Sequence, residues 1–154
     1  MTKSHDVASI RSRRESLLRA AIGLEDALAS PVGDGERWRL RVAMATDHAT
    51  ARIVEHISQT EGAGNILEEV SAHAPRLARR VEQMLVDHER LEKAAHDLQT
   101  AVAELDHVDD DQLEAQAIVV RNKSVDMMGL IARHRQRGSD LLYEAYHVDL
   151  GDSA

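Results

Sequence analysis

The chain has 154 residues, a net charge of −8 and 43% hydrophobic residues, with no Cys, no Phe, one Trp and two Tyr. This length suits one domain with a single core, and the scarcity of aromatic residues favours helices packed through Leu, Val, Ile, Met and Ala over a sheet. Interspersed charges argue against nucleic-acid binding, and no apolar run reaches the ~20 residues of a membrane span. Because there is also no Cys and no signal peptide, we expect a cytoplasmic protein without disulfides.

Four long segments carry apolar residues at alternating steps of three and four, which is the period of an amphipathic helix. We predict the first helix from Val7 to about Ser30 and the second from Glu36 to Glu61. A short helical piece from Ile66 to His73 precedes Pro75, where the third helix starts and runs to about Leu105. The fourth helix covers residues 112–147.

The third and fourth helices have the clearest apolar seams, and the seam of the third is interrupted only by His88. Four such helices with short connections predict an all-α fold, an up-down-up-down four-helix bundle. We expect one domain over residues 1–154, with short polar tails at 1–6 and 150–154.

Three of the nine histidines fall on helix seams, namely His56, His88 and His134. An imidazole in an apolar seam loses its hydration unless a partner pairs with it, and a metal ion is one such partner. The other six fall on outward positions, at helix ends or in connections, and are predicted to be solvated: His5, His48, His73, His96, His107 and His147.

The three seam histidines form a site only if they lie at one height along the bundle. Folding the chain at its turns places His88 beside Glu61 and within two turns of His56. With the third connection centred near residues 107–108, His134 lies six or seven residues beyond His88, or about 10 Å at 1.5 Å per residue. That mismatch counts against a shared site.

Acidic residues near these histidines are candidate ligands. Glu61 follows His56 by five residues, a spacing that converges only if the helix loosens at its end. Glu92 lies one turn after the histidine of the third helix. The same folding arithmetic places His56 near Arg14 and Glu15 of the first helix, and an inward Arg14 would oppose a dicationic site.

The segments HISQTEG at 56–62, DHERL around His88 and RHRQRGSDLLYEAYHVDLG at 133–151 resemble the hemerythrin-like, or HHE cation-binding, domains. The resemblance implies a four-helix bundle that holds two non-haem irons bridged by carboxylates. Members of that family bind dioxygen or nitric oxide, sense oxygen or iron, or decompose peroxide. The ligands that the resemblance implies here are His56, Glu61, His88 and His134, with Glu61 as a bridge.

The family's ligand pattern is incomplete in this chain. The first helix offers no histidine, Met84 and Glu92 occupy the positions one turn from His88, and Gly138 and Ser139 stand where an acid is expected. A single-metal site, an acid-rich variant and a lost site are therefore all open.

The leading hypothesis is a hemerythrin-like protein with one or two non-haem irons that binds or reacts with dioxygen, nitric oxide or peroxide. Glu15 or Glu92 would complete its ligand shell, and both a peroxide-decomposing enzyme and a binding protein fit. Zinc accepts the same ligands, so the choice of iron rests on the resemblance. The rival is a metal-free structural or protein-interaction module with His56 and His88 as neutral core residues. A homodimer through exposed apolar strips is a third interpretation.

Overall fold

The computed structural model describes residues 7–62 and 64–148, without the side chains of residues 7–11, 13, 14 and 148. Every regular element in these ranges is helical, so the prediction of an all-α protein is confirmed. The helices are α1 (Val7–Ala29), α2 (Gly35–Thr60), α3 (Ile66–His73), α4 (Ala78–Ala103) and α5 (Leu113–Tyr143). Two 3-10 turns, η1 (Pro75–Leu77) and η2 (Glu104–Asp106), flank α4, and a π-helical turn, η3 (Glu144–Val148), follows α5. None of the described helices is long and apolar enough to cross a membrane.

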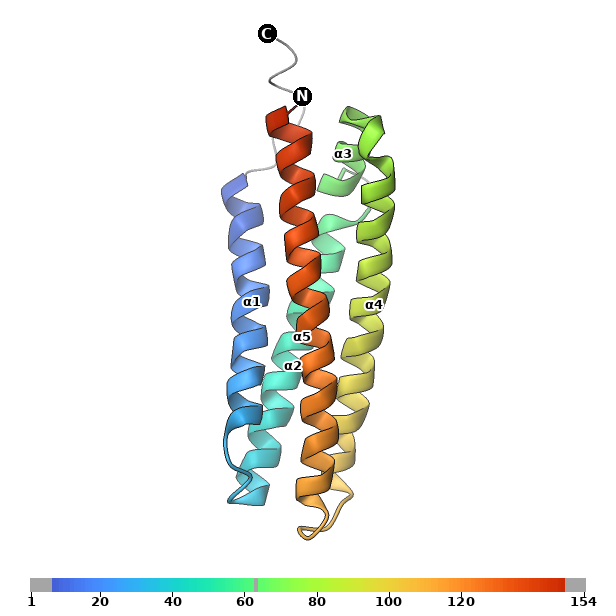
Figure 1. The fold of residues 1–154 in the computed structure, drawn as a ribbon. Coiled ribbons are helices and arrows are strands. Elements are labelled where there is room, and N and C mark those ends of the chain that lie inside the picture. The colour runs from blue at the N-terminus through green and yellow to red at the C-terminus, as the bar shows by residue number, and fades with distance from the viewer. Residues whose placement is uncertain (1–6, 63, 149–154) are drawn as a thin grey trace.

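The four long helices pack side by side with their axes roughly aligned (Figure 1). α1 packs on α2, α2 on α4, α4 on α5, and α5 on α1, so each long helix has two neighbours. The connections at 30–34 and 107–112 lie at one end of the molecule, and α3 lies at the other (Figure 1). As a result, α2, α4 and α5 share an interior to which each contributes one face.

The predicted apolar seams face that interior. One hydrophobic cluster joins the four long helices, and a smaller one joins α3, η1, the start of α4 and the end of α5. Each large side chain that leaves water in this way stabilises the fold by about 1.5–3 kcal/mol. The seam residues that we expected in the core are at most 2% exposed: Leu91, Leu98, Met127, Ile131 and Leu141.

Local signals determine where α2 and α4 begin and end. The Asp34 carboxylate caps the N-terminus of α2, and Gly62, with φ of 94°, follows its last residues. Between helix and glycine, Glu61 adopts an extended conformation with φ of −95° and ψ of 161°. The helix predicted from Pro75 starts instead as the turn η1, because Leu77 (φ −94°, ψ 2°) departs from α-helical geometry.

Arg39, near the start of α2, fixes the connection between α4 and α5. Its Nε donates to the carbonyl of Leu105 at 2.8 Å, and its Nη2 donates to the carbonyl of Val108 at 3.0 Å. Its Nη1 pairs with Asp110 at 3.2 Å. These contacts hold the connection between α4 and α5 against the N-terminal end of α2.

Candidate metal centre

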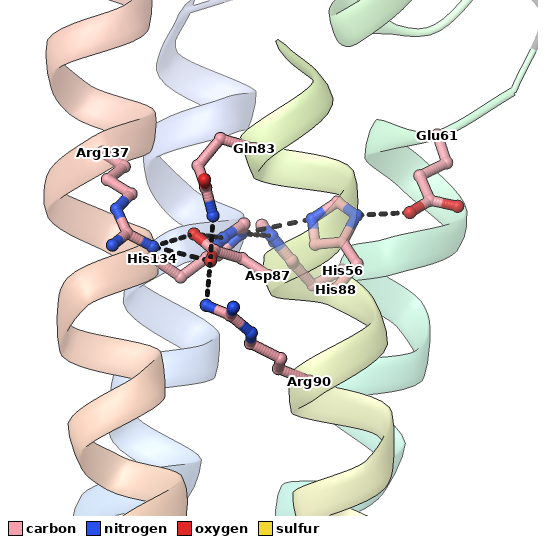
Figure 2. Close-up of polar contacts among 8 residues, drawn as sticks. All are labelled: His56, Glu61, Gln83, Asp87, His88, Arg90, His134 and Arg137. Carbon is pink, nitrogen blue, oxygen red and sulfur yellow. Dashed lines mark hydrogen bonds and ion pairs between the residues drawn. The ribbon is translucent and has the colours of Figure 1, made fainter. Parts of the chain in front are cut away.

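Three histidines from three helices meet in the interior between α2, α4 and α5 (Figure 2). Nε2 of His134 lies 2.9 Å from Nε2 of His56 and 3.2 Å from Nε2 of His88. His88 and His134 are only 1% and 2% exposed, whereas His56 is partly buried. One ligand nitrogen from each ring lies within 4.8 Å of the other two. The structure thus brings together three of the four residues predicted as ligands.

The expectation that His134 lies about 10 Å beyond His88 is wrong, because it counted part of the α4–α5 connection as rising helix. In the structure η2 continues α4 to Asp106, residues 107–112 form the turn, and α5 begins only at Leu113. The helical segment from His88 to the turn and the segment from the turn to His134 then differ in length by about three residues. The larger rise of a 3-10 turn, about 2.0 Å per residue, takes up part of that difference.

The three histidine nitrogens lie within 4.8 Å of one another, close enough to be candidate ligands of a single metal ion. Imidazole nitrogens suit divalent zinc, copper, nickel and iron, so the ligand set alone does not select among these metals.

Glu61 contacts the outer nitrogen of one ring, because its Oε1 lies 2.6 Å from Nδ1 of His88. The predicted height of His88 beside Glu61 is therefore confirmed. The contact depends on the extended conformation of Glu61, since a continued helix would place it about 140° around the axis from His56. In this conformation the carboxylate lies on the far side of the ring from the three Nε2 atoms and orients His88.

Asp87 takes the corresponding place beside His134. Its Oδ2 lies 3.7 Å from Nδ1 of His134, a charge-pair distance longer than a hydrogen bond. Arg137 holds this carboxylate through Nη1, which donates to Oδ1 at 2.6 Å and to Oδ2 at 2.7 Å. Gln83 donates to Oδ1 at 3.3 Å, and Arg90 lies 3.9 Å from the same oxygen (Figure 2).

Burial by itself would raise the pKa of Asp87. The hydrogen bonds from Arg137 and Gln83, together with the positive charge of Arg137, outweigh it and hold the pKa below its usual value. The Asp87 carboxylate is therefore negatively charged at neutral pH, inside the protein and next to His134.

Glu61 favours one form of the His88 ring. A carboxylate only accepts, so Glu61 stabilises the form of His88 that carries its proton on Nδ1. Nε2 of His88 then carries a lone pair, and it faces Nε2 of His134 at 3.2 Å. Asp87 lies 3.7 Å from Nδ1 of His134, too far for a hydrogen bond that would fix the form of that ring.

The structure does not bring the other candidate ligands to the cluster. Glu15 lies at the surface 3.8 Å from Arg19, and Glu92 is exposed. His5 and the side chain of Arg14 lie outside the described residues. The remaining histidines predicted to be solvated are exposed, as expected: His48, His73, His96, His107 and His147.

Sequence reasoning missed the ion pair next to His134, between the buried Asp87 and the partly exposed Arg137. The available signal was the acid directly before a seam histidine on α4, together with an arginine three residues after another seam histidine on α5. The two residues can be paired only if the position of α5 along the bundle relative to α4 is known, and the sequence-based position of His134 was wrong.

Comparison of the chain with protein-family models, with curated proteins and with solved structures found no match. The class of protein is therefore defined by the fold and the site. The protein is a helical bundle with a cluster of three histidines that could hold a metal ion.

Proposed function

We propose that the protein is a hemerythrin-like, up-down-up-down four-helix bundle that binds a single non-haem iron ion on His56, His88 and His134. The observation that carries metal binding is the convergence of three rings in the interior, where Nε2 of His134 lies 2.9 Å from Nε2 of His56 and 3.2 Å from Nε2 of His88. Glu61 supports it, because the form of His88 with its proton on Nδ1 leaves the Nε2 lone pair of that ring for a metal ion.

A metal ion explains the cluster better than a shared proton does. A proton links two nitrogens, whereas His134 has the Nε2 atoms of both His56 and His88 within 3.2 Å. A metal ion accepts all three lone pairs at once. Two outer carboxylates also supply negative charge that offsets part of the charge of a divalent ion, which is the usual arrangement around histidine ligands.

Iron is the metal that we propose, on the basis of the resemblance to hemerythrin-like domains. One ion is proposed because the described residues bring together three histidine nitrogens and no bridging carboxylate. The three imidazoles would hold the ferrous ion, which would supply binding of dioxygen, nitric oxide or peroxide.

The three histidines would bind this ion in the interior of the bundle. The two outer acids would supply negative charge beside the histidine rings. Without a second iron and a closed ligand shell, we expect reaction with peroxide or nitric oxide in place of reversible oxygen carriage. Anaerobic loading with ferrous iron followed by exposure to oxygen tests this. A stable, reversible oxygenated spectrum with two irons per chain would contradict the single-ion proposal.

The alternative is a metal-free structural or protein-interaction module. The observation that favours it is that the same Nε2 contacts, at 2.9 and 3.2 Å, fall within hydrogen-bond distance. Under this alternative one imidazole would carry an extra proton and the cluster would serve only to orient the helices.

Metal analysis of protein purified without a His-tag separates the two functions. We expect about one iron per chain in the parent and none in His88→Ala, because His88 supplies one of three ligands. His96→Ala is the matched control, since His96 is on the same helix α4 but exposed. Iron-free parent protein after anaerobic loading, or equal loss of iron from both variants, would favour the interaction module.

A further inference from the structure

A small cavity lies between α1 and α2 and reaches His56. Its volume is about 30 Å³, and its lining is formed by Ser16, Leu17, Arg52, Glu55, His56 and Gln59. A site of about 10–15 Å³ already holds one water molecule. The cavity therefore has room for a water or a diatomic molecule, and little more.

The position of this cavity matters because His56 is the only member of the histidine cluster that is not fully buried. His88 and His134 are 1% and 2% exposed, so their helices close the cluster on the α4 and α5 sides. On the α1 side, the residues beside His56 are Ser16 and Leu17, neither of which is a metal ligand. The cavity between α1 and α2 therefore lies beside the one member of the cluster that is partly exposed.

The α2 side of the cavity is braced by polar contacts centred on Glu55. Arg52 donates from Nη1 to Oε2 of Glu55 at 2.6 Å. Gln59 donates to Oε1 of the same carboxylate at 3.1 Å. Both long side chains are thus held together on the α2 side of the lining, while the α1 side is formed by Ser16 and Leu17. Ser16 is the shorter of these two α1 residues, so added bulk at this position would fill part of the small cavity.

Resting on the proposed iron site, we infer that this cavity is the route by which small exogenous molecules reach the metal, with Ser16 and the Arg52–Glu55–Gln59 group as its size filter. The class of ligand that passes is uncharged and has about two heavy atoms, such as dioxygen or nitric oxide. Larger molecules can reach the metal only when the helices move apart.

Nitric oxide binding to the ferrous protein, followed by stopped-flow absorption, tests this route. Ser16→Val adds branched apolar bulk at the narrow wall, so we expect nitric oxide to associate at least tenfold more slowly while iron content and helicity stay at parent values. Ser58→Val is the matched control, since Ser58 is an exposed serine on α2 whose side chain does not line the cavity, and it should associate at the parent rate.

Glu55→Ala is a second variant, which should make ligand binding faster where Ser16→Val makes it slower. Loss of the carboxylate frees Arg52 and Gln59, so n-butyl isocyanide, which should bind the parent at least a hundredfold more slowly than nitric oxide, should bind this variant faster. Equal nitric oxide rates in Ser16→Val and Ser58→Val would overturn the route, as would rapid isocyanide binding to the parent. A parent that takes up no iron contradicts the proposed function itself, and the route falls with it.

Discussion

Replacing Arg137 by Met should destabilise the protein more than replacing its partner Asp87 by Asn. The side chain of Asp87 is 6% exposed and that of Arg137 is 42% exposed, so the two members of the ion pair differ in their access to water. In Arg137→Met the carboxylate stays buried beside His134 with only Gln83 donating to it, at 3.3 Å, and Arg90 more distant, at 3.9 Å. In Asp87→Asn the remaining guanidinium can turn to solvent.

The expected magnitudes follow from this asymmetry. Removing one partner of a fully buried ion pair costs about 3–5 kcal/mol, but water reaches the outer side of Arg137, so we expect about 2 kcal/mol for Arg137→Met. Asp87→Asn keeps an oxygen that Gln83 can still donate to, and should cost about 1 kcal/mol. The double variant should resemble Asp87→Asn, because the buried charge is then absent.

Urea denaturation of the metal-free protein in the presence of a chelator measures these differences, since bound metal would add its own stabilisation. Midpoints are compared at equal m-values, with helicity followed by circular dichroism. The reasoning is refuted if Arg137→Met is no less stable than Asp87→Asn. It is also refuted if the double variant is as unstable as Arg137→Met, because the cost would then not come from an unpaired carboxylate.

Three further predictions address the site, the pH dependence and the core. Glu61→Gln should weaken Fe²⁺ binding by about 10–100-fold in a chelator competition, while the exposed control Glu92→Gln should leave it unchanged. Burial, a hydrogen bond to Glu69 and the charge of that residue raise the pKa of Tyr146 above its usual 10.0. The contribution of Tyr146 to stability is therefore complete below pH 10 and is lost as pH rises further, so in urea the parent should lose more stability above about pH 10 than Tyr146→Phe does. Leu98→Ala, at a position with 0% exposure, should lower the free energy of unfolding by about 2–5 kcal/mol, and a loss below 1 kcal/mol would contradict the core assignment.

The local pattern of the sequence was sufficient for the fold class. Steps of three and four residues identify the face of a helix that must leave water, so Leu91, Leu98 and Ile131 could be assigned to the core before any tertiary information. The same pattern marked His88 and His134 as polar residues on apolar faces, because burial of a face depends on the residues of one helix.

The positions of the histidines along the length of the bundle were predicted less well than the helices themselves. The short path from α2 through α3 to α4 placed His88 correctly beside Glu61. The path from α4 to α5 did not place His134, because Arg39 of α2 holds the connection at residues 107–112 through contacts 66–71 residues apart in sequence. No local signal in the sequence of that connection indicates at which residue α4 ends and the turn begins.

The sequence by itself determined the helices, their buried faces and the three histidines that could meet, since each of these follows from the residues of a single segment. Only the tertiary structure decided that the Nε2 atoms of those histidines converge and that Asp87 lies against Arg137, 50 residues away in the chain. Such contacts depend on the rotation and height of one helix relative to another. Those two quantities are fixed by packing and by the long-range contacts of the turns, and the periodicity of a single helix carries no information about either.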